Sequence, residues 1–254
     1  RFADAKGWLD RALEGSAGID AEFLGFLGLD LRALAFMYSS WTSWHLGLAD
    51  LAREHQTAAL ASAEATGRVY VRVHSMVLVG ACVSQFMGDG AAVRQFAEEA
   101  ARLSAKHGFP IWSLWSGIWM TWAAAAEGHD PAPLQTRATA AALAAAFKGT
   151  GSRLALGHVL TLVAETVWRS GAAGSAESLL DEALDVVEEV DPGWSAEVHR
   201  VKGELVLARA RAEGSAALER EAREWFERAL AIAEDRGSRA LAARVQASLD
   251  RAGA

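Results

Sequence analysis

Cysteine, proline and tyrosine are scarce in this sequence, and each shortage excludes a class of protein. The single cysteine, Cys82, cannot form an internal disulfide or a thiolate metal cluster, so we expect an intracellular, cytoplasmic protein that needs no oxidising compartment. Only 4 prolines and 2 tyrosines, set among 52% hydrophobic residues with long alanine runs, favour helices over a β-sandwich. The composition therefore predicts an all-α fold.

Positive charge is also in short supply. The 25 Lys and Arg residues are outnumbered by 32 Asp and Glu residues, and the formal net charge is -7. A protein whose main work is binding the backbone of DNA or RNA carries the opposite balance. We therefore expect no nucleic-acid partner.

One long uncharged segment raises the question of a membrane. Residues 107–126 carry no formal charge, and a segment of this length can cross a bilayer. However, Pro110, Ser113 and Ser116 dilute its apolar character, and its tryptophans are not gathered into two bands. We expect a helix buried between neighbouring helices, and no membrane partner.

The residue patterns typical of catalysis are missing from the sequence. No two histidines form an HxxxH pair, no serine lies in a Gly-x-Ser-x-Gly elbow, and Cys82 sits among apolar residues. Adjacent carboxylates such as Glu98 and Glu99 diverge by about 100° on a helix, so we expect them to face solvent. The sequence predicts no enzymatic activity, no metal site and no cofactor.

What the sequence does contain is a repeat. Ala-rich helical stretches end at glycines spaced 41, 43, 42 and 44 residues apart: Gly67, Gly108, Gly151, Gly193 and Gly237. All the prolines fall where this period predicts helix starts: Pro110, Pro131, Pro133 and Pro192. Proline is tolerated in the first turn of a helix and disrupts its interior. The period predicts about five repeats of about 42 residues, each with two helices, A and B.

The expected helices follow from these boundaries. We expect A helices over 30–45, 69–87, 111–127, 152–169 and 195–211, B helices over 48–66, 91–107, 134–148, 173–190 and 217–236, and a final helix over 239–251. A helical hairpin of this size cannot bury its own apolar face, so neighbouring hairpins must stack. We expect a single right-handed α-solenoid domain over 1–254, with a concave side.

The fourth unit has the small-residue pattern of a tetratricopeptide repeat. Small residues stand in the turn and where helices A and B approach most closely: Ala164, Gly171, Ala176 and Ala183. Ala222 and Ala229 repeat part of this pattern in the last unit. There an extra polar stretch, 211–221, is expected to lengthen the connection between the two helices.

The second half of the chain resembles a particular family. Residues 194–208, W-S-A-E-V-H-R-V-K-G-E-L-V-L-A, together with the helix that follows, resemble the C-terminal tetratricopeptide region of large bacterial signalling proteins. Residues 91–123 resemble the second unit of that region leading into the third, and the similarity covers roughly 69–251. In those proteins such repeats flank a P-loop signal-transduction ATPase, often with a class III adenylate or guanylate cyclase domain or a transcription-regulator domain.

The resemblance implies a regulatory region whose catalytic domains lie elsewhere. The GxxxxGK[ST] loop, the cyclase metal carboxylates and a helix-turn-helix are all missing from this sequence. The chain also opens at Arg1, without a charged-then-apolar leader. We therefore expect it to be a piece of a longer, multidomain protein.

Tryptophans are concentrated on one face of the third A helix. Spacings of three, four and three residues align Trp112, Trp115, Trp119 and Trp122. Either these rings form an aromatic wall of the concave groove, which would bind a flat apolar ligand or side chain, or they fill the seam between adjacent units. Trp41 and Trp44 on the first A helix allow the same two interpretations.

A second stripe along the A helices is polar. At the 42-residue period, equivalent positions are occupied by His74, Ser116, His158 and His199. The tetratricopeptide pattern places on the concave side of the fourth unit His158, Thr161, Glu165, Trp168 and Arg169. If these residues face the groove, it suits a polar or anionic ligand. Otherwise they are solvated or tie neighbouring helices together.

The fifth unit can be aligned in two ways. The period directs His199 and Lys202 inward. The glycine of the K-G-E-L phrase instead directs three other residues inward: Glu197, Arg200 and Glu204. Both alignments stay open at this point.

Two functions fit these observations. The first is a non-catalytic module whose concave face binds a protein or peptide segment, including domains of the parent protein, and regulates an attached signalling domain. The second is a sensor of a small-molecule effector, which a closed pocket with converging Trp and His would favour over a wide charged channel. In either case the candidate binding residues are His74, Trp115, Trp119, Trp122, His158, Thr161, Glu165, Trp168, His199, Arg200 and Lys202. The oligomeric state stays open.

Overall fold

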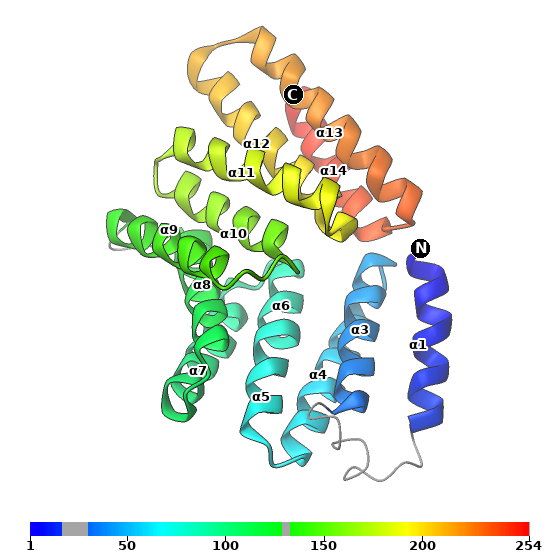
Figure 1. The fold of residues 1–254 in the computed structure, drawn as a ribbon. Coiled ribbons are helices and arrows are strands. Elements are labelled where there is room, and N and C mark those ends of the chain that lie inside the picture. The colour runs from blue at the N-terminus through cyan, green and yellow to red at the C-terminus, as the bar shows by residue number, and fades with distance from the viewer. Residues whose placement is uncertain (17–29, 129–132, 254) are drawn as a thin grey trace. The chain divides into compact units, whose positions relative to one another are not determined.

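A computed structural model describes residues 1–16, 30–128 and 133–253 of the chain. The regular structure in these ranges is helical throughout and contains no strand, which confirms the expected all-α class. The chain divides into two compact units, Arg1–Ala123 and Ala124–Ala254, and each is described by itself (Figure 1). The single repeat domain expected over 1–254 stays a prediction.

The first unit contains the helices up to α8. Their bounds are α1 Phe2–Ser16, α3 Leu31–His45, α4 Ala49–Ala65, α5 Val69–Ser75, the π-helical segment η2 Met76–Ala81, α6 Cys82–Phe86, α7 Gly90–His107 and α8 Pro110–Ala126, whose end passes into the second unit. Helix α3 packs on both α1 and α4, and α7 packs on η2. The segments α5, η2 and α6 follow one another without a break, as the expected helix over 69–87 requires.

The second unit contains the helices from α9 onward. Their bounds are α9 Pro133–Gly149, α10 Leu156–Arg169, α11 Ala173–Glu189, the 3-10 turn η3 Pro192–Trp194, α12 Ser195–Glu213, α13 Ala216–Arg236 and α14 Arg239–Gly253. Helix α10 packs on both α9 and α11, and α12 packs on α11, α13 and α14. Successive helices therefore cover one another's apolar faces, which no single hairpin could do alone.

The expected helix bounds agree with the structure to within two residues, except at one end. The fourth A helix was expected to begin at residue 152, but α10 begins at Leu156. Ala155 has a left-handed backbone with φ 57°, and its N–H donates to Asp191 Oδ2 at 3.1 Å. The helix starts late because this contact, made with a residue 36 positions away, holds Ala155 outside helical geometry.

Left-handed glycines mark the ends of helices in two interleaved series. One series follows the A helices in steps of 41, 40, 43 and 43 residues: Gly47, Gly88, Gly128, Gly171 and Gly214. The other follows B helices: Gly67, Gly108, Gly151 and Gly237. The expected fourth member, Gly193, is absent from the left-handed set and lies in the η3 turn instead. Glycine suits these turns because a side chain strains a positive φ.

Prolines begin helical segments in the structure. Pro110 and Pro133 begin α8 and α9, and Pro192 begins η3, whereas Pro131 lies outside the described residues.

The expectation that 211–221 lengthens the connection between the two helices of the last unit is wrong. Only Gly214 and Ser215 connect α12 to α13, because the stretch extends both helices. The Ser215 hydroxyl accepts from the Leu218 N–H as the N-cap of α13.

Close helix contacts depend on small residues, as the repeat pattern predicted. Ala164, Ala176 and Ala183 are all buried in the contact between α10 and α11 or beside it. Gly80 and Gly203 also have no room for a side chain, because a Cβ would lie 2.7 Å from the Phe96 ring in the first case and 2.6 Å from the Phe226 ring in the second. In both places, an aromatic ring of a B helix contacts the backbone of an A helix directly.

Side chains from neighbouring helices stabilise the π-helical segment η2. Its turn is wider than that of an α-helix, so its backbone hydrogen bonds join residues five apart and not four apart. Trp41 Nε1 donates to Leu78 O at 2.9 Å, and Gln56 Nε2 donates to Gly80 O at 3.0 Å. Helices α3 and α4 therefore hold η2 through hydrogen bonds in addition to apolar contacts.

One helix in the described part of the chain is long and apolar enough to cross a membrane by length and composition. It covers Val69–Phe86, with a mean hydropathy of 1.3 and 67% of its residues buried. A buried apolar helix is also typical of a protein core. The uncharged segment 107–126, discussed above, does not meet the same test.

Candidate functional site

The tryptophan stripe of α8 is buried. Trp112, Trp115, Trp119 and Trp122 are each no more than 7% exposed. Trp115 and Trp119 stack with ring centroids 6.2 Å apart, and Trp119 meets Trp122 edge-on at 6.4 Å. The rings therefore pack on one another, and a role for Trp115, Trp119 and Trp122 as a binding wall stays a prediction.

The tryptophans of α3 are also engaged in packing. Trp44 is buried and stacks on Phe86 at 4.6 Å, and the half-buried Trp41 donates its indole hydrogen bond to η2. Both rings connect α3 to the continuous helix formed by α5, η2 and α6.

His74 and Ser116, the first members of the polar stripe, are buried as well. The His74 ring meets the edge of Trp112 at 5.2 Å, and burial lowers the pKa of His74 to about 4. The Ser116 hydroxyl donates to Trp112 O within its own helix at 2.7 Å. His74 is therefore a neutral ring at physiological pH.

His158 stacks on a tryptophan that the sequence reasoning did not select. Its ring lies 3.9 Å from the ring of Trp194, with 12° between the planes. Burial lowers the pKa of His158 to about 3, against the opposing attraction of Glu197. The nearby Thr161 hydroxyl donates to Gly157 O at 2.7 Å, while Trp168 is half-buried.

A buried ionic cluster joins three helices of the second unit. At its centre, Arg200 of α12 donates to Glu197 from two of its guanidinium nitrogens, Nη2 at 2.6 Å and Nε at 2.8 Å. Arg200 also lies 3.9 Å from Glu165 of α10 and 3.5 Å from Glu204. Helix α14 completes the cluster, because Arg244 reaches Glu197 at 3.3 Å and Arg251 reaches Glu204 at 2.5 Å.

The charges of this cluster keep Glu197 and Arg200 ionised. Burial raises the pKa of Glu197, but the charges of Arg200 and Arg244 and the hydrogen bonds from Arg200 outweigh it and lower that pKa to about 2. The same acidic partners raise the pKa of Arg200 despite its burial. The cluster is thus an internally neutralised network that ties α10, α12 and α14 together.

The residues of both alignments of the fifth unit lie in contacts between helices, and which alignment faces a groove stays a prediction. Glu197, Arg200 and Glu204 lie on the face of α12 that meets Glu165. Lys202 points to a different neighbour, since its ammonium lies 2.7 Å from Asp181 of α11. His199 also turns elsewhere, with its ring 5.6 Å from Trp225 of α13.

Groupings of side chains with metal-binding or catalytic potential are few and buried in the described residues. The described residues contain no set of three or more His, Cys, Asp and Glu side chains that could hold a metal ion. Ser43 Oγ and His55 Nδ1 are 3.4 Å apart, but Ser43 is only 1% exposed. Cys82 is buried too, and burial raises the pKa of its thiol.

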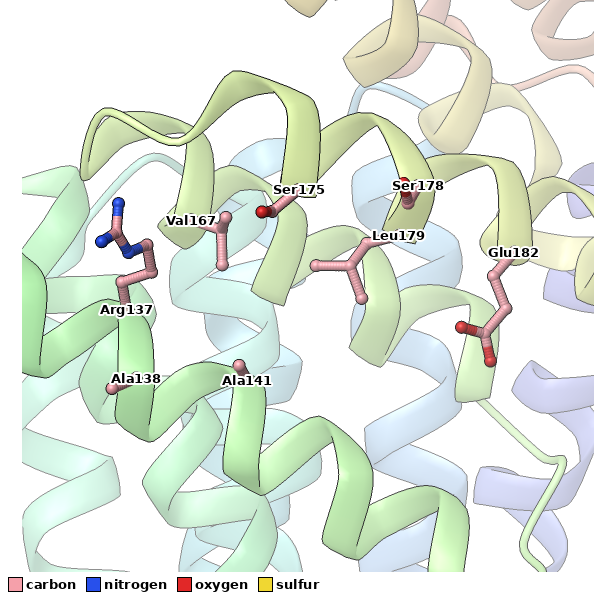
Figure 2. Close-up of a pocket in the computed structure, with 8 residues that line it drawn as sticks. All are labelled: Arg137, Ala138, Ala141, Val167, Ser175, Ser178, Leu179 and Glu182. Carbon is pink, nitrogen blue, oxygen red and sulfur yellow. The ribbon is translucent and has the colours of Figure 1, made fainter.

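A groove in the second unit opens between α9 and α11. Both helices pack on α10, and Figure 2 shows α9 and α11 facing each other across the opening. The cavity has a volume of about 490 Å³. It is lined by Arg137, Ala138, Ala141, Val167, Ser175, Ser178, Leu179 and Glu182. None of these residues belongs to the set expected from the sequence.

The two ends of this groove, called here the α9/α11 groove, differ in charge. At one end, Lys148 of α9 binds Glu182 of α11 at 2.9 Å. At the other end stands Arg137, which forms no ion pair with any residue that the structure describes. Between them the walls offer alanine methyl groups, Leu179 and the Ser175 hydroxyl (Figure 2).

Comparison with known proteins adds no assignment. No model of a protein family matches this chain, and no curated protein matches it significantly.

Proposed function

We propose that this chain is a non-catalytic helical-repeat module that binds a segment of another protein, or of another domain of its parent. The α9/α11 groove is the observation that carries the proposal. It combines an apolar middle with one arginine that has no acidic partner in the described residues, and it lies between the helices of a rigid packed scaffold. Such a concave apolar site with a few polar groups suits recognition.

The repeat architecture in this proposal is a right-handed solenoid of about five tetratricopeptide-like units. The two series of left-handed glycines support it: the first recurs in steps of 40 to 43 residues, and the second in steps of 41 and 43 residues and then one double step of 86. The buried alanines of α10 and α11 support it as well. Such modules bind partners through surfaces formed by several successive helices.

The parent protein in this proposal is a bacterial signalling protein acting in the cytoplasm. The support is the likeness of residues 194–208 and 91–123 to the tetratricopeptide regions described above. The module would regulate an attached ATPase, cyclase or transcription regulator, and the chemistry would lie in those domains. Neither a cofactor nor a metal has a part in this function.

The test begins with capture of partners on the immobilised full chain, followed by titration of each purified candidate by calorimetry. The proposal expects a saturable complex with a protein, and loss of affinity when Ala141 is replaced by Trp. Replacement of Ala146 by Trp is the matched control, because Ala146 is also an exposed alanine of α9 but does not line the groove. Absence of any saturable protein complex would overturn the proposal.

An effector sensor is the second candidate function. The volume of about 490 Å³ favours it, since small-molecule pockets measure about 300–1,000 Å³. A metabolite screen by thermal shift separates the two functions. A saturable shift with a metabolite, lost in Ala141→Trp and found without any protein partner, would favour the sensor.

A further inference from the structure

The α9/α11 groove is open because of the residues on one of its walls. Helix α9 contributes Ala138 and Ala141, whose side chains end at a methyl group. Both alanines are exposed although they face the opposite wall (Figure 2). The open volume is therefore a consequence of the alanine-rich sequence of α9.

The corresponding space between the next pair of helices, α11 and α13, is filled by side chains. Helices α11 and α13 both pack on α12, as α9 and α11 pack on α10. There Lys202 of α12 binds Asp181 at 2.7 Å and lies 6.0 Å from the ring of Trp225, while Arg209 binds Glu177 at 2.8 Å. Large side chains of this chain occupy that second space, whereas the α9/α11 groove stays open among the residues that the structure describes.

The walls restrict the conformation of an occupant. Both walls are α-helices whose backbone groups are paired internally, so they cannot add a β-strand by main-chain hydrogen bonds. An occupant must satisfy its own backbone groups, and a helix does so completely. Small wall residues also allow a helix to approach closely. The 12 residues from Arg137 to Lys148 give the wall a length of about 16 Å, or three helical turns.

The charges of the groove determine the direction of such a helix. Helices α9 and α11 both begin at the Arg137 end, so the positive ends of two helix dipoles add to the guanidinium (Figure 2). The N-terminus of α11 also lacks a side-chain cap. The opposite end carries the Lys148–Glu182 ion pair, which is already neutralised.

We infer that the α9/α11 groove binds an amphipathic α-helix of a partner protein, antiparallel to α9 and α11. Its apolar face packs against Ala138, Ala141 and Leu179, and a carboxylate near its C-terminal end binds Arg137. This inference rests on the proposed function and specifies the partner: a helix of about three turns that is apolar on one face and acidic at one end.

The test uses a display library of helices of about 14 residues, randomised on one face and at both ends, and selected on the full chain. The best clone is then synthesised as a labelled peptide, and its Kd is measured by fluorescence anisotropy. We expect an apolar face and an Asp or Glu at the C-terminal end. Affinity should fall about tenfold or more with Ala141→Trp or Arg137→Glu, and should be retained with Ala146→Trp.

A charge exchange tests the direction of the bound helix. A peptide whose terminal carboxylate is replaced by Lys should regain affinity for the Arg137→Glu chain, and should not do so when the Lys is moved to its N-terminal end. Selected peptides that bind equally well to the Ala141→Trp chain, or a selection that yields no helix dependent on Ala141, would overturn the inference. Peptides that bind equally well to the Ala141→Trp chain would still show that the chain binds peptides, at a surface other than the groove. The proposed function itself fails only if no protein partner is found.

Discussion

Gly203 of α12 packs directly against the ring of Phe226 on α13, so that a Cβ on Gly203 would lie 2.6 Å from Phe226 Cε1. Phe226 is completely buried, and its ring has little space to retreat. The glycine of the K-G-E-L phrase is therefore required by the contact between two helices.

Replacing Gly203 by Ala should destabilise the chain by about 1–3 kcal/mol, because the added methyl group overlaps the buried ring. Urea unfolding followed by circular dichroism measures the change. Gly174→Ala is the matched control, since Gly174 is an exposed helical glycine with nothing within 4 Å of its Cβ position. The control should gain about 0.5 kcal/mol. Equal stability of Gly203→Ala and the parent chain would contradict the described packing.

Replacing Arg200 by Met should destabilise the second unit by about 3–5 kcal/mol, because the buried carboxylates around it lose their central cation. Arg153→Met is the control. Arg153 forms a comparable pair with Glu189 at 2.7 Å, but its side chain is 48% exposed. Exposed pairs contribute little to stability, because solvent screens their charges. Similar unfolding free energies for the two variants would contradict a buried network.

Glu197 should make the second unit sensitive to strong acid. Its pKa in the folded state, about 2, lies below its usual value of 4.5. The stabilisation is therefore complete above pH 4.5 and is lost as the pH falls toward 2. In Arg200→Met, Glu197 loses the cation that lowers its pKa most, so this acid-dependent loss should become smaller, which urea unfolding at a series of pH values can detect. An unchanged acid transition would be inconsistent with the Arg200–Glu197 pair.

His74 and His158 should lower stability under mildly acidic conditions. Their folded pKa values of about 4 and about 3 lie below the usual 6.5, so the unfolded state binds protons first as the pH falls. Each should reduce the unfolding free energy by roughly 2 kcal/mol between neutral pH and about pH 5. Phe at both positions keeps an aromatic ring and should flatten the dependence measured by urea unfolding. A slope that persists unchanged would refute this assignment.

Cys82 should be unreactive in the folded chain. It is 2% exposed, and burial raises the pKa of its thiol, so little thiolate forms at neutral pH. A chromogenic disulfide reagent should label Cys82 only as fast as the first unit unfolds, and labelling should become rapid in urea. Rapid labelling under native conditions would mean that α6 is not packed as described.

The helix boundaries could be predicted from the sequence because local chemistry determines them. Glycines that adopt positive φ and prolines that begin helices mark the ends directly. The late start of α10 could not be predicted in this way, since Ala155 is held by Asp191, far along the chain. Local patterns carry no information on such a contact.

The candidate site was predictable only in part. The repeat pattern selected Glu165, and one of the two alignments of the fifth unit pointed to Glu197, Arg200 and Glu204; the structure brings these residues together. Their partners Arg244 and Arg251 were missed because α14 follows the last repeat and had no equivalent helix for alignment. The α9/α11 groove was missed for another reason. Helix α9 has alanine on every side, and a helix without a polar face does not reveal which side is left uncovered.

The central claim is that partners bind in the α9/α11 groove, and site-specific photo-crosslinking tests it most directly. A photoreactive phenylalanine derivative replaces Ala141 in the groove, Ala146 outside the groove, or Trp168. Trp168 is a half-buried residue of the set first expected from the sequence. The account predicts that a purified binding partner crosslinks to the chain labelled at Ala141 and not to the chain labelled at Ala146. Crosslinks at Trp168 with none at Ala141 would contradict it.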